Sequence, residues 1–333
     1  MIKICIPELS ITMHHKKYYD DICYYLEEIQ SKKHIKVSRD SKKYFRDFYN
    51  LFVSCNILIE PPEVLEDFIQ QEKRISSICF GGKRPNHINA WLSNLFSYSS
   101  FQNGHYIHIK GIKERDGKKI KSDNWNAWIF LESLNISVCP YCNADTVYAT
   151  TVVKNNEQVK IRSALDHYYP KSLYPFLAIS LYNLIPTCDR CNSNIKGKRD
   201  FSSLKEYIHP YVDSFHDGIE FKKKILKTSG FMGNSDGFEI ELVRKTNSVL
   251  SEKSIKSAQF FSIAEIYNAL FKKDAANVIL KTNLNVESYR SFLLDKGISS
   301  DEIDRLIWGC SLDPTQINQN RLSKMFIDLI NKV

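Results

Sequence analysis

Residues 165–197 read LDHYYPKSLYPFLAISLYNLIPTCDRCNSNIKG and end in a Cys-x-x-Cys pair, Cys188 and Cys191. A second pair, Cys139 and Cys142, lies upstream with 45 residues between the two pairs. Four thiolates complete a tetrahedral zinc site and leave no position open for a substrate. The separation exceeds that of a zinc ribbon, so a folded unit must lie between the pairs. We therefore predict one structural Zn²⁺ on these four cysteines, with unligated thiols or a redox pair as the alternative.

The residues around this cysteine frame indicate short strands. Thr146–Val153 and Gln158–Leu165 are rich in β-branched residues and flank Lys154–Glu157, which predicts a hairpin. A third strand is predicted at Leu184–Thr187. Before and after this module, apolar and aromatic residues recur at helical spacing, and Ser299 begins a capping-box pattern. The prediction is an α+β fold with a helical region at 1–122, the cysteine module at 123–235 and a helical region at 236–333.

Composition places the chain among ordinary globular proteins. It has 333 residues, of which 43% are hydrophobic and 25% charged, and it shows neither a membrane-spanning run nor a signal peptide. We therefore expect a cytoplasmic protein without a membrane partner. The net charge of +8 is carried by residues 1–235, and the segment 110–121, which includes Lys118 and Lys119, holds six basic residues. Such a run can contact a polyanion, although a solvated loop is the commoner explanation for a run of charges.

The motifs inside the cysteine frame resemble a known family. The Asp166-His167 pair, Asn183 in an Asn-Leu-Ile-Pro run, and Asn192 directly after the last cysteine resemble the HNH, or ββα-metal, endonucleases. More narrowly, residues 139–197 look like four-cysteine HNH proteins encoded beside ATPases in bacterial anti-phage systems, of which the Septu nuclease subunit is one type. The first 120 residues show no such resemblance.

The resemblance implies a ββα-metal core and assigns four roles. His167 would be the general base, since an imidazole titrates close to neutrality. Asp166 and Asn192 would hold a catalytic Mg²⁺ or Mn²⁺, because carboxylate and amide oxygens are hard ligands. Asn183 would brace the loop that orients His167. Read without the family, Asn183 is a turn residue and Asn192 is a helix cap.

Basic residues follow the second cysteine pair. Lys196, Lys198 and Arg199 would contact phosphates that flank the cut, or would simply balance the dipole at a helix end.

The leading hypothesis is a metal-dependent endonuclease, with DNA favoured over RNA as substrate. The family resemblance also implies an ATPase partner. The chain has no GxxxxGK[ST] motif of its own, so the nucleotide would be bound by that partner. The alternatives are a zinc-stabilised binding module without cleavage, and a nuclease subunit held silent by the ATPase. The charge-balanced C-terminal helices are a candidate protein interface, for a partner or a second copy.

Overall fold

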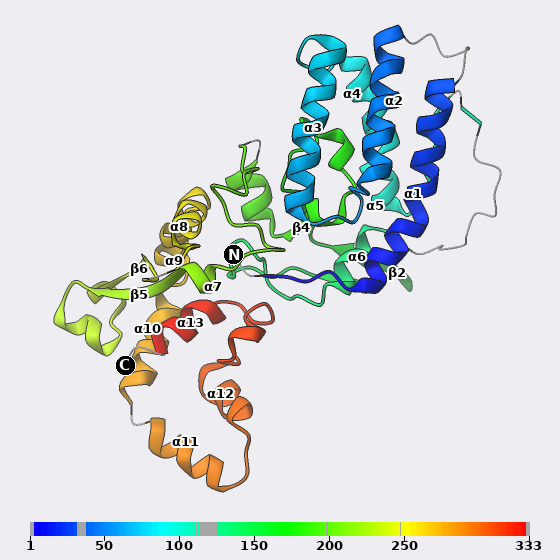
Figure 1. Ribbon diagram of the computed structural model, residues 1–333. Helices are drawn as coiled ribbons and strands as arrows, with labels where there is room; N and C mark the ends of the chain where they lie inside the picture. The colour runs from blue at the N-terminus through cyan, green and yellow to red at the C-terminus, as the bar shows by residue number, and fades with distance from the viewer. Residues whose placement is uncertain are drawn as a thin grey trace.

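A computed structural model shows short strands set among helices (Figure 1). It describes residues 3–31, 38–110, 112–113, 125–197, 199–246, 248–284 and 286–330. Three predicted nucleic-acid contacts, Lys118, Lys119 and Lys198, lie outside these ranges. Among the helices of the described ranges, none has both the length and the apolar composition that a membrane span requires.

The N-terminal region is a group of helices whose aromatic residues face inwards. Phe45, Phe48 and Phe52 recur at helical spacing on α2 and are fully buried, and Ser38 caps that helix. The aromatic stripes therefore form core. The helices of this part are α1 (Glu8–Ser31), α2 (Arg39–Ser54), α3 (Pro62–Phe80), α4 (Asn86–Leu95), α5 (Tyr98–Asn103) and α6 (Ala127–Ser133).

The strands form three antiparallel pairs, β1 with β2, β3 with β4, and β5 with β6. The predicted hairpin and the predicted strand at Leu184–Thr187 are confirmed. Asn155 and Asn156 both have positive φ, which matches the twist that a two-residue hairpin turn requires. The bounds are β1 (Ala149–Lys154), β2 (Glu157–Arg162), β3 (Ala164–His167), β4 (Leu184–Thr187), β5 (Ile219–Ile225) and β6 (Phe238–Arg244).

The predicted strand Gln158–Leu165 is wrong as a single element, because the chain changes partner at Ser163. The backbone amide of Ser163 donates to the Tyr148 carbonyl at 2.8 Å, and its hydroxyl accepts from the Tyr148 amide at 3.1 Å. The Ser163 side chain thus takes a place in the ladder and ends β2. The following residues, β3, pair with β4 instead.

The described residues from Phe215 onwards are mainly helical and include the β5–β6 hairpin, which the sequence pattern did not predict and which crosses the predicted boundary at 235/236. The capping box of Ser299 and Glu302 is confirmed. Helix α13 packs on β5, where the Asp328 carboxylate accepts from the Phe221 amide at 2.8 Å. The helices are α7 (Phe215–Gly218), α8 (Ser251–Phe260), α9 (Ile263–Leu270), α10 (Lys272–Asn283), α11 (Val286–Asp295), α12 (Ser300–Trp308) and α13 (Ser323–Ile330), with 3₁₀ turns at Thr228–Met232, Ser235–Gly237 and Pro314–Gln316.

One buried apolar cluster runs through all three regions, from Ile4 to Leu329. Phe176, in the loop between β3 and β4, packs against Phe48 and Phe68 with ring centroids 5.8 and 5.5 Å apart. The N-terminal helices therefore support the loop that follows His167. The mixed helix and strand content agrees with the α+β prediction.

Candidate active site and metal centre

The four cysteines meet at one point, as predicted. Their sulfur atoms all lie within 4.8 Å of one another and all four side chains are buried. The Cys142 and Cys188 sulfurs are 3.9 Å apart. A tetrahedral zinc ion with bonds of about 2.3 Å needs sulfur–sulfur edges of about 3.8 Å. The cluster can therefore hold one ion of this size with little adjustment.

The charge of the cluster also fits a cation. Burial alone would raise the pKa of the Cys139 thiol, but S–H bonds from the other three cysteines hold that pKa well below its ordinary value. Those same contacts with Cys139 raise the pKa of Cys142 and Cys191. The neighbours thus favour a thiolate at Cys139, and a bound divalent ion would stabilise further negative charge on the cluster.

The C-terminal region holds the first cysteine pair in place. Asn143, which follows Cys142, has φ of 53°, a conformation that Asn tolerates better than most residues. Its side-chain amide donates to the Ile317 carbonyl at 3.0 Å and accepts from the Lys324 amide at 3.0 Å. The Tyr267 hydroxyl donates to the Cys142 carbonyl at 2.8 Å. The cysteine cluster is therefore part of the interface between the module and the C-terminal helices.

The residues of the candidate active site come from a strand pair and a helix. Strand β3 ends in Asp166 and His167, which are consecutive and point to opposite faces of the sheet. After β4, the helix Arg190–Lys196 (η3), with the wide turn of a π-helix, carries Asn192. The chain thus runs from β3 through β4 into a π-helical segment, in that order.

His167 is held in one tautomer. Its ring is half-buried, and Nε2 lies 2.9 Å from the Ala178 carbonyl oxygen. A carbonyl only accepts, so Nε2 carries the proton and Nδ1 keeps its lone pair. Burial lowers the pKa of His167 to about 4, against an opposing contribution from the Ala178 hydrogen bond. At neutral pH this imidazole is uncharged, with Nδ1 as its acceptor atom. The expectation that His167 titrates close to neutrality is therefore wrong, because burial disfavours its charged form.

Tyr98 is a neighbour of His167 that sequence reasoning missed. The two rings meet edge to face at 4.7 Å, and the ammonium of Lys171 lies 5.0 Å from the Tyr98 ring. Tyr98 belongs to α5, in the region without a family motif. No pattern in the sequence identified it.

Asn183 lies where a loop brace is needed. It is fully buried, and its side-chain oxygen accepts from the Tyr169 amide at 2.7 Å. Its side-chain nitrogen donates to the carbonyls of Tyr169 at 3.1 Å and Leu177 at 2.8 Å. These bonds close the loop that presents the Ala178 carbonyl to His167. The side chain does not face solvent as that of a simple turn residue would.

Asp166 is buried, and its charge is already compensated. Its carboxylate accepts from the Lys196 ammonium at 2.8 Å on both oxygens and from the Tyr141 hydroxyl at 2.7 Å. Lys196 also donates to the His167 carbonyl and is only 3% exposed. The structure thus places Lys196 in the interior, where its ammonium is bound to Asp166 and to the His167 carbonyl. In this position it does not contact a phosphate, contrary to the prediction from the sequence. A divalent ion does not fit at Asp166 while this ammonium is there.

Asn192 and Arg199 complete the predicted set. Asn192 is half-buried in the third position of its helix, which Asp189 begins, so the reading of Asn192 as the cap is wrong. Its backbone amide donates to the Cys188 carbonyl at 3.0 Å. Arg199 is exposed, donates to the Ile195 carbonyl and lies 4.3 Å over the Phe260 ring. Its guanidinium therefore stabilises the helix end.

Comparison with known proteins gives two partial similarities. The chain is 35% identical over 71 residues to the Septu protein PtuB of Bacillus thuringiensis, which covers 21% of this chain and 27% of that protein. It is 25% identical over 132 residues to Protein ea31 of Escherichia phage lambda, covering 38% and 43%. The matched stretches thus span less than half of either relative. No protein-family model and no solved structure matches the chain.

Proposed function

We propose that this chain is an HNH-type endonuclease that hydrolyses phosphodiester bonds of nucleic acid, DNA in preference to RNA. One observation carries the proposal. A neutral His167, held by the Ala178 carbonyl so that Nδ1 accepts, ends the first strand of a ββα element beside a closed four-cysteine cluster. That is the group which a reaction with water as nucleophile requires.

In the proposed reaction, Nδ1 of His167 takes a proton from water as the oxygen attacks phosphorus. The bond to the 3′ oxygen breaks, and a 5′-phosphate end remains. Asn183 acts at a distance from the phosphate, since its three hydrogen bonds hold the loop that fixes the His167 tautomer. A Mg²⁺ or Mn²⁺ ion on Asp166 and Asn192 would supply charge neutralisation at the phosphate, and it requires Lys196 to leave the Asp166 carboxylate.

The biological setting is proposed from the partial similarity to a Septu protein. We infer an effector nuclease in an anti-phage system that works with an ATPase partner. The chain itself has no GxxxxGK[ST] motif, so a nucleotide-dependent step would fall to that partner.

A binding module without cleavage is the second candidate. The observation that favours it is the neutralised carboxylate, since the Lys196 ammonium is bound to both Asp166 oxygens. In that case the zinc cluster and the ββα element would serve recognition alone.

Nicking of supercoiled plasmid separates the two candidates. The purified chain should nick with Mg²⁺ or Mn²⁺ and stop with a chelator. His167→Ala should lower the rate by about 10² or more, the usual size of a general-base contribution, with its zinc content unchanged. His105→Ala, at an exposed histidine, is the matched control. Parental nicking by His167→Ala would remove the proposed mechanism, and binding without nicking under every metal condition would favour the binding module.

A further inference from the structure

A groove lies between the N-terminal helices and the loop that follows His167. It has a volume of about 400 Å³ and runs between the end of α3, the turn from α3 to α4, and residues 172–174. We call it the α3–α4 groove. The residues that matter for its chemistry are Glu72, Lys73, Lys83, Arg84, Ser172 and Tyr174.

The groove is positively charged because its one carboxylate is neutralised. Glu72 is fully buried and accepts from the Tyr44 hydroxyl at 2.8 Å and the Ser76 hydroxyl at 2.7 Å. Its second oxygen is paired with Arg84. Lys73 and Lys83 are exposed, and no carboxylate in the described ranges forms an ion pair with either. Two ammonium groups therefore remain available to an anionic ligand.

The walls of the groove are fixed to each other by Arg84. Its guanidinium donates to Asn89 of α4 at 2.9 Å and to the Leu173 carbonyl, and lies 5.2 Å over the Phe176 ring. Arg84 thus uses its donors on the protein and ties the helices to the loop that Asn183 braces. The backbone that carries Lys73 on α3 and Lys83 in the turn after it is consequently tied to the loop that follows His167.

The groove lies close to His167 along the chain. Ser172 lines it, and the preceding Lys171 reaches the ring of Tyr98, which contacts His167. Ser172 is the fifth residue after His167, so at most about 17 Å of extended chain joins the two. At about 3.4 Å for each nucleotide of a strand, this limit corresponds to about five steps. The edge of the groove at Ser172 therefore lies within about five nucleotide steps of His167, close enough for phosphates beside the cut to reach it.

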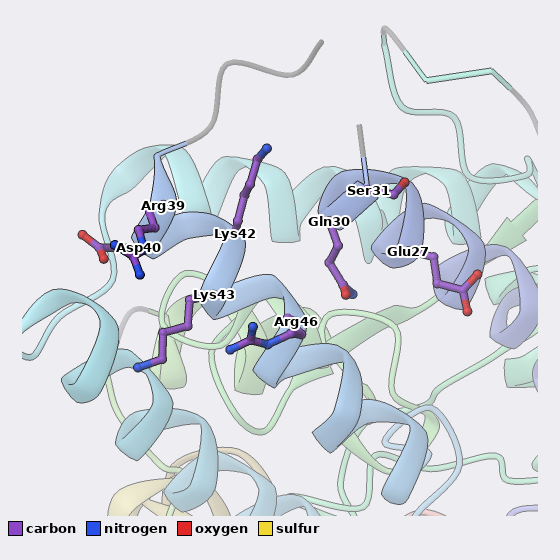
Figure 2. A pocket seen from close by; sticks show the side chains of 8 residues that line it. All are labelled: Glu27, Gln30, Ser31, Arg39, Asp40, Lys42, Lys43 and Arg46. Carbon is purple, nitrogen blue, oxygen red and sulfur yellow. The ribbon is translucent and has the colours of Figure 1, made fainter. Parts of the chain in front are cut away.

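A larger hollow between α1 and α2 lacks this connection. Figure 2 shows the basic side chains of α2 beside Glu27 and Gln30 of α1, around a volume of about 820 Å³. Two acidic residues, Glu27 and Asp40, lie among the basic residues that line this hollow, and Arg46 is paired with Asp47. None of the described residues that line it comes from the nuclease module. We assign no function to the hollow between α1 and α2.

We propose that the α3–α4 groove binds the phosphodiester backbone of the nucleic-acid strand beside the cut, with Lys73 and Lys83 as phosphate contacts and Lys171 between the groove and His167. The inference rests on the proposed nuclease function. It gives the N-terminal helices a role in substrate binding. Because ammonium groups recognise phosphate and not bases, DNA and RNA are both ligands of this chemistry.

Binding is measured by fluorescence anisotropy in the His167→Ala chain, so that cleavage does not consume the probe. Lys73→Gln/Lys83→Gln is compared with Lys273→Gln/Lys296→Gln, two exposed lysines of the C-terminal region. Each duplex phosphate contact contributes about 0.9 to the salt slope. Losing two should lower the slope by about 1.8 and weaken duplex binding about 30-fold at 0.15 M salt. Lys73→Arg/Lys83→Arg should restore most of the affinity.

The assay is run with duplex DNA, single-stranded DNA and RNA, and the arm with the largest effect identifies the substrate. Equal affinity of the Lys73→Gln/Lys83→Gln chain and the control in all three arms would refute the proposal that the α3–α4 groove binds the nucleic-acid backbone. The two proposals also fail separately. If the chain never nicks but binds through these lysines, the groove proposal stands and the nuclease proposal is refuted. If the chain nicks but its binding does not depend on these lysines, the nuclease proposal stands and the groove proposal is refuted.

Discussion

Replacing Lys196 by Met tests whether the site is built around a buried ion pair. The Lys196 ammonium lies 2.8 Å from each Asp166 oxygen, and the two side chains are 4% and 8% exposed. After the substitution, the Tyr141 hydroxyl still donates to that carboxylate. A charge would then be left in the interior with one hydrogen bond.

The expected cost follows from burial. Removing one partner of a buried pair destabilises a protein by about 3–5 kcal/mol, whereas an exposed pair contributes about 0–1 kcal/mol. Lys196→Met should therefore lower the free energy of unfolding, measured by urea titration, by about 3–5 kcal/mol. Lys196→Met/Asp166→Asn should recover most of this loss, because the uncompensated charge is gone. A loss below about 1 kcal/mol for Lys196→Met would refute the reasoning.

The chain offers a matched control in α13. Lys324 and Asp328 form a second buried pair, with side chains 4% and 5% exposed. Lys324→Met should destabilise the fold by a similar amount and leave Mn²⁺ binding at the active site unchanged. Lys196→Met should bind Mn²⁺ more tightly than the parent, because no ammonium competes for Asp166. That gain should disappear in Lys196→Met/Asp166→Asn, as followed by calorimetric titration.

Two further predictions concern metal and pH. Removing the metal with a chelator, or through Cys188→Ser, should abolish zinc in elemental analysis and lower the thermal midpoint sharply, because structural zinc contributes about 10–16 kcal/mol in small domains. Burial lowers the pKa of His14 and of His209 to about 3 in the folded chain. The unfolded chain therefore binds protons that the folded chain does not, so the urea midpoint should fall as pH drops below about 6.5. An unchanged midpoint between pH 7 and pH 4 would contradict this.

Local signals in the sequence predicted the parts of the fold that depend on neighbouring residues. The cysteine spacing predicted a cluster that the structure confirms, and Ser299 with Glu302 predicted a helix start that is present. The break at Ser163 could not be predicted, because it depends on a hydrogen bond with Tyr148 across the hairpin. β-Branched composition indicates strand character and does not say which strand is the partner.

The interior of the site was the least predictable part. A lysine after a cysteine pair reads as a surface charge, and its burial is decided by Asp166, thirty residues earlier. Tyr98 and Arg84 come from a region without any motif, and only the packing of Phe176 on the helices brings them to the loop. Sequence motifs pointed to the candidate catalytic residues and missed the residues that set their environment.

The four-cysteine cluster is connected to the candidate active site by two direct contacts. Tyr141 lies between Cys139 and Cys142, and its side-chain hydroxyl donates to Asp166 at 2.7 Å. On the other side, the Asn192 amide donates to the Cys188 carbonyl at 3.0 Å. The two residues proposed to hold the catalytic cation are thus each bonded to a residue of a Cys-x-x-Cys segment, Asp166 to a side chain and Asn192 to the backbone. We therefore expect loss of a metal from the four cysteines to displace both residues, so that a site closed to substrate would still affect the proposed reaction.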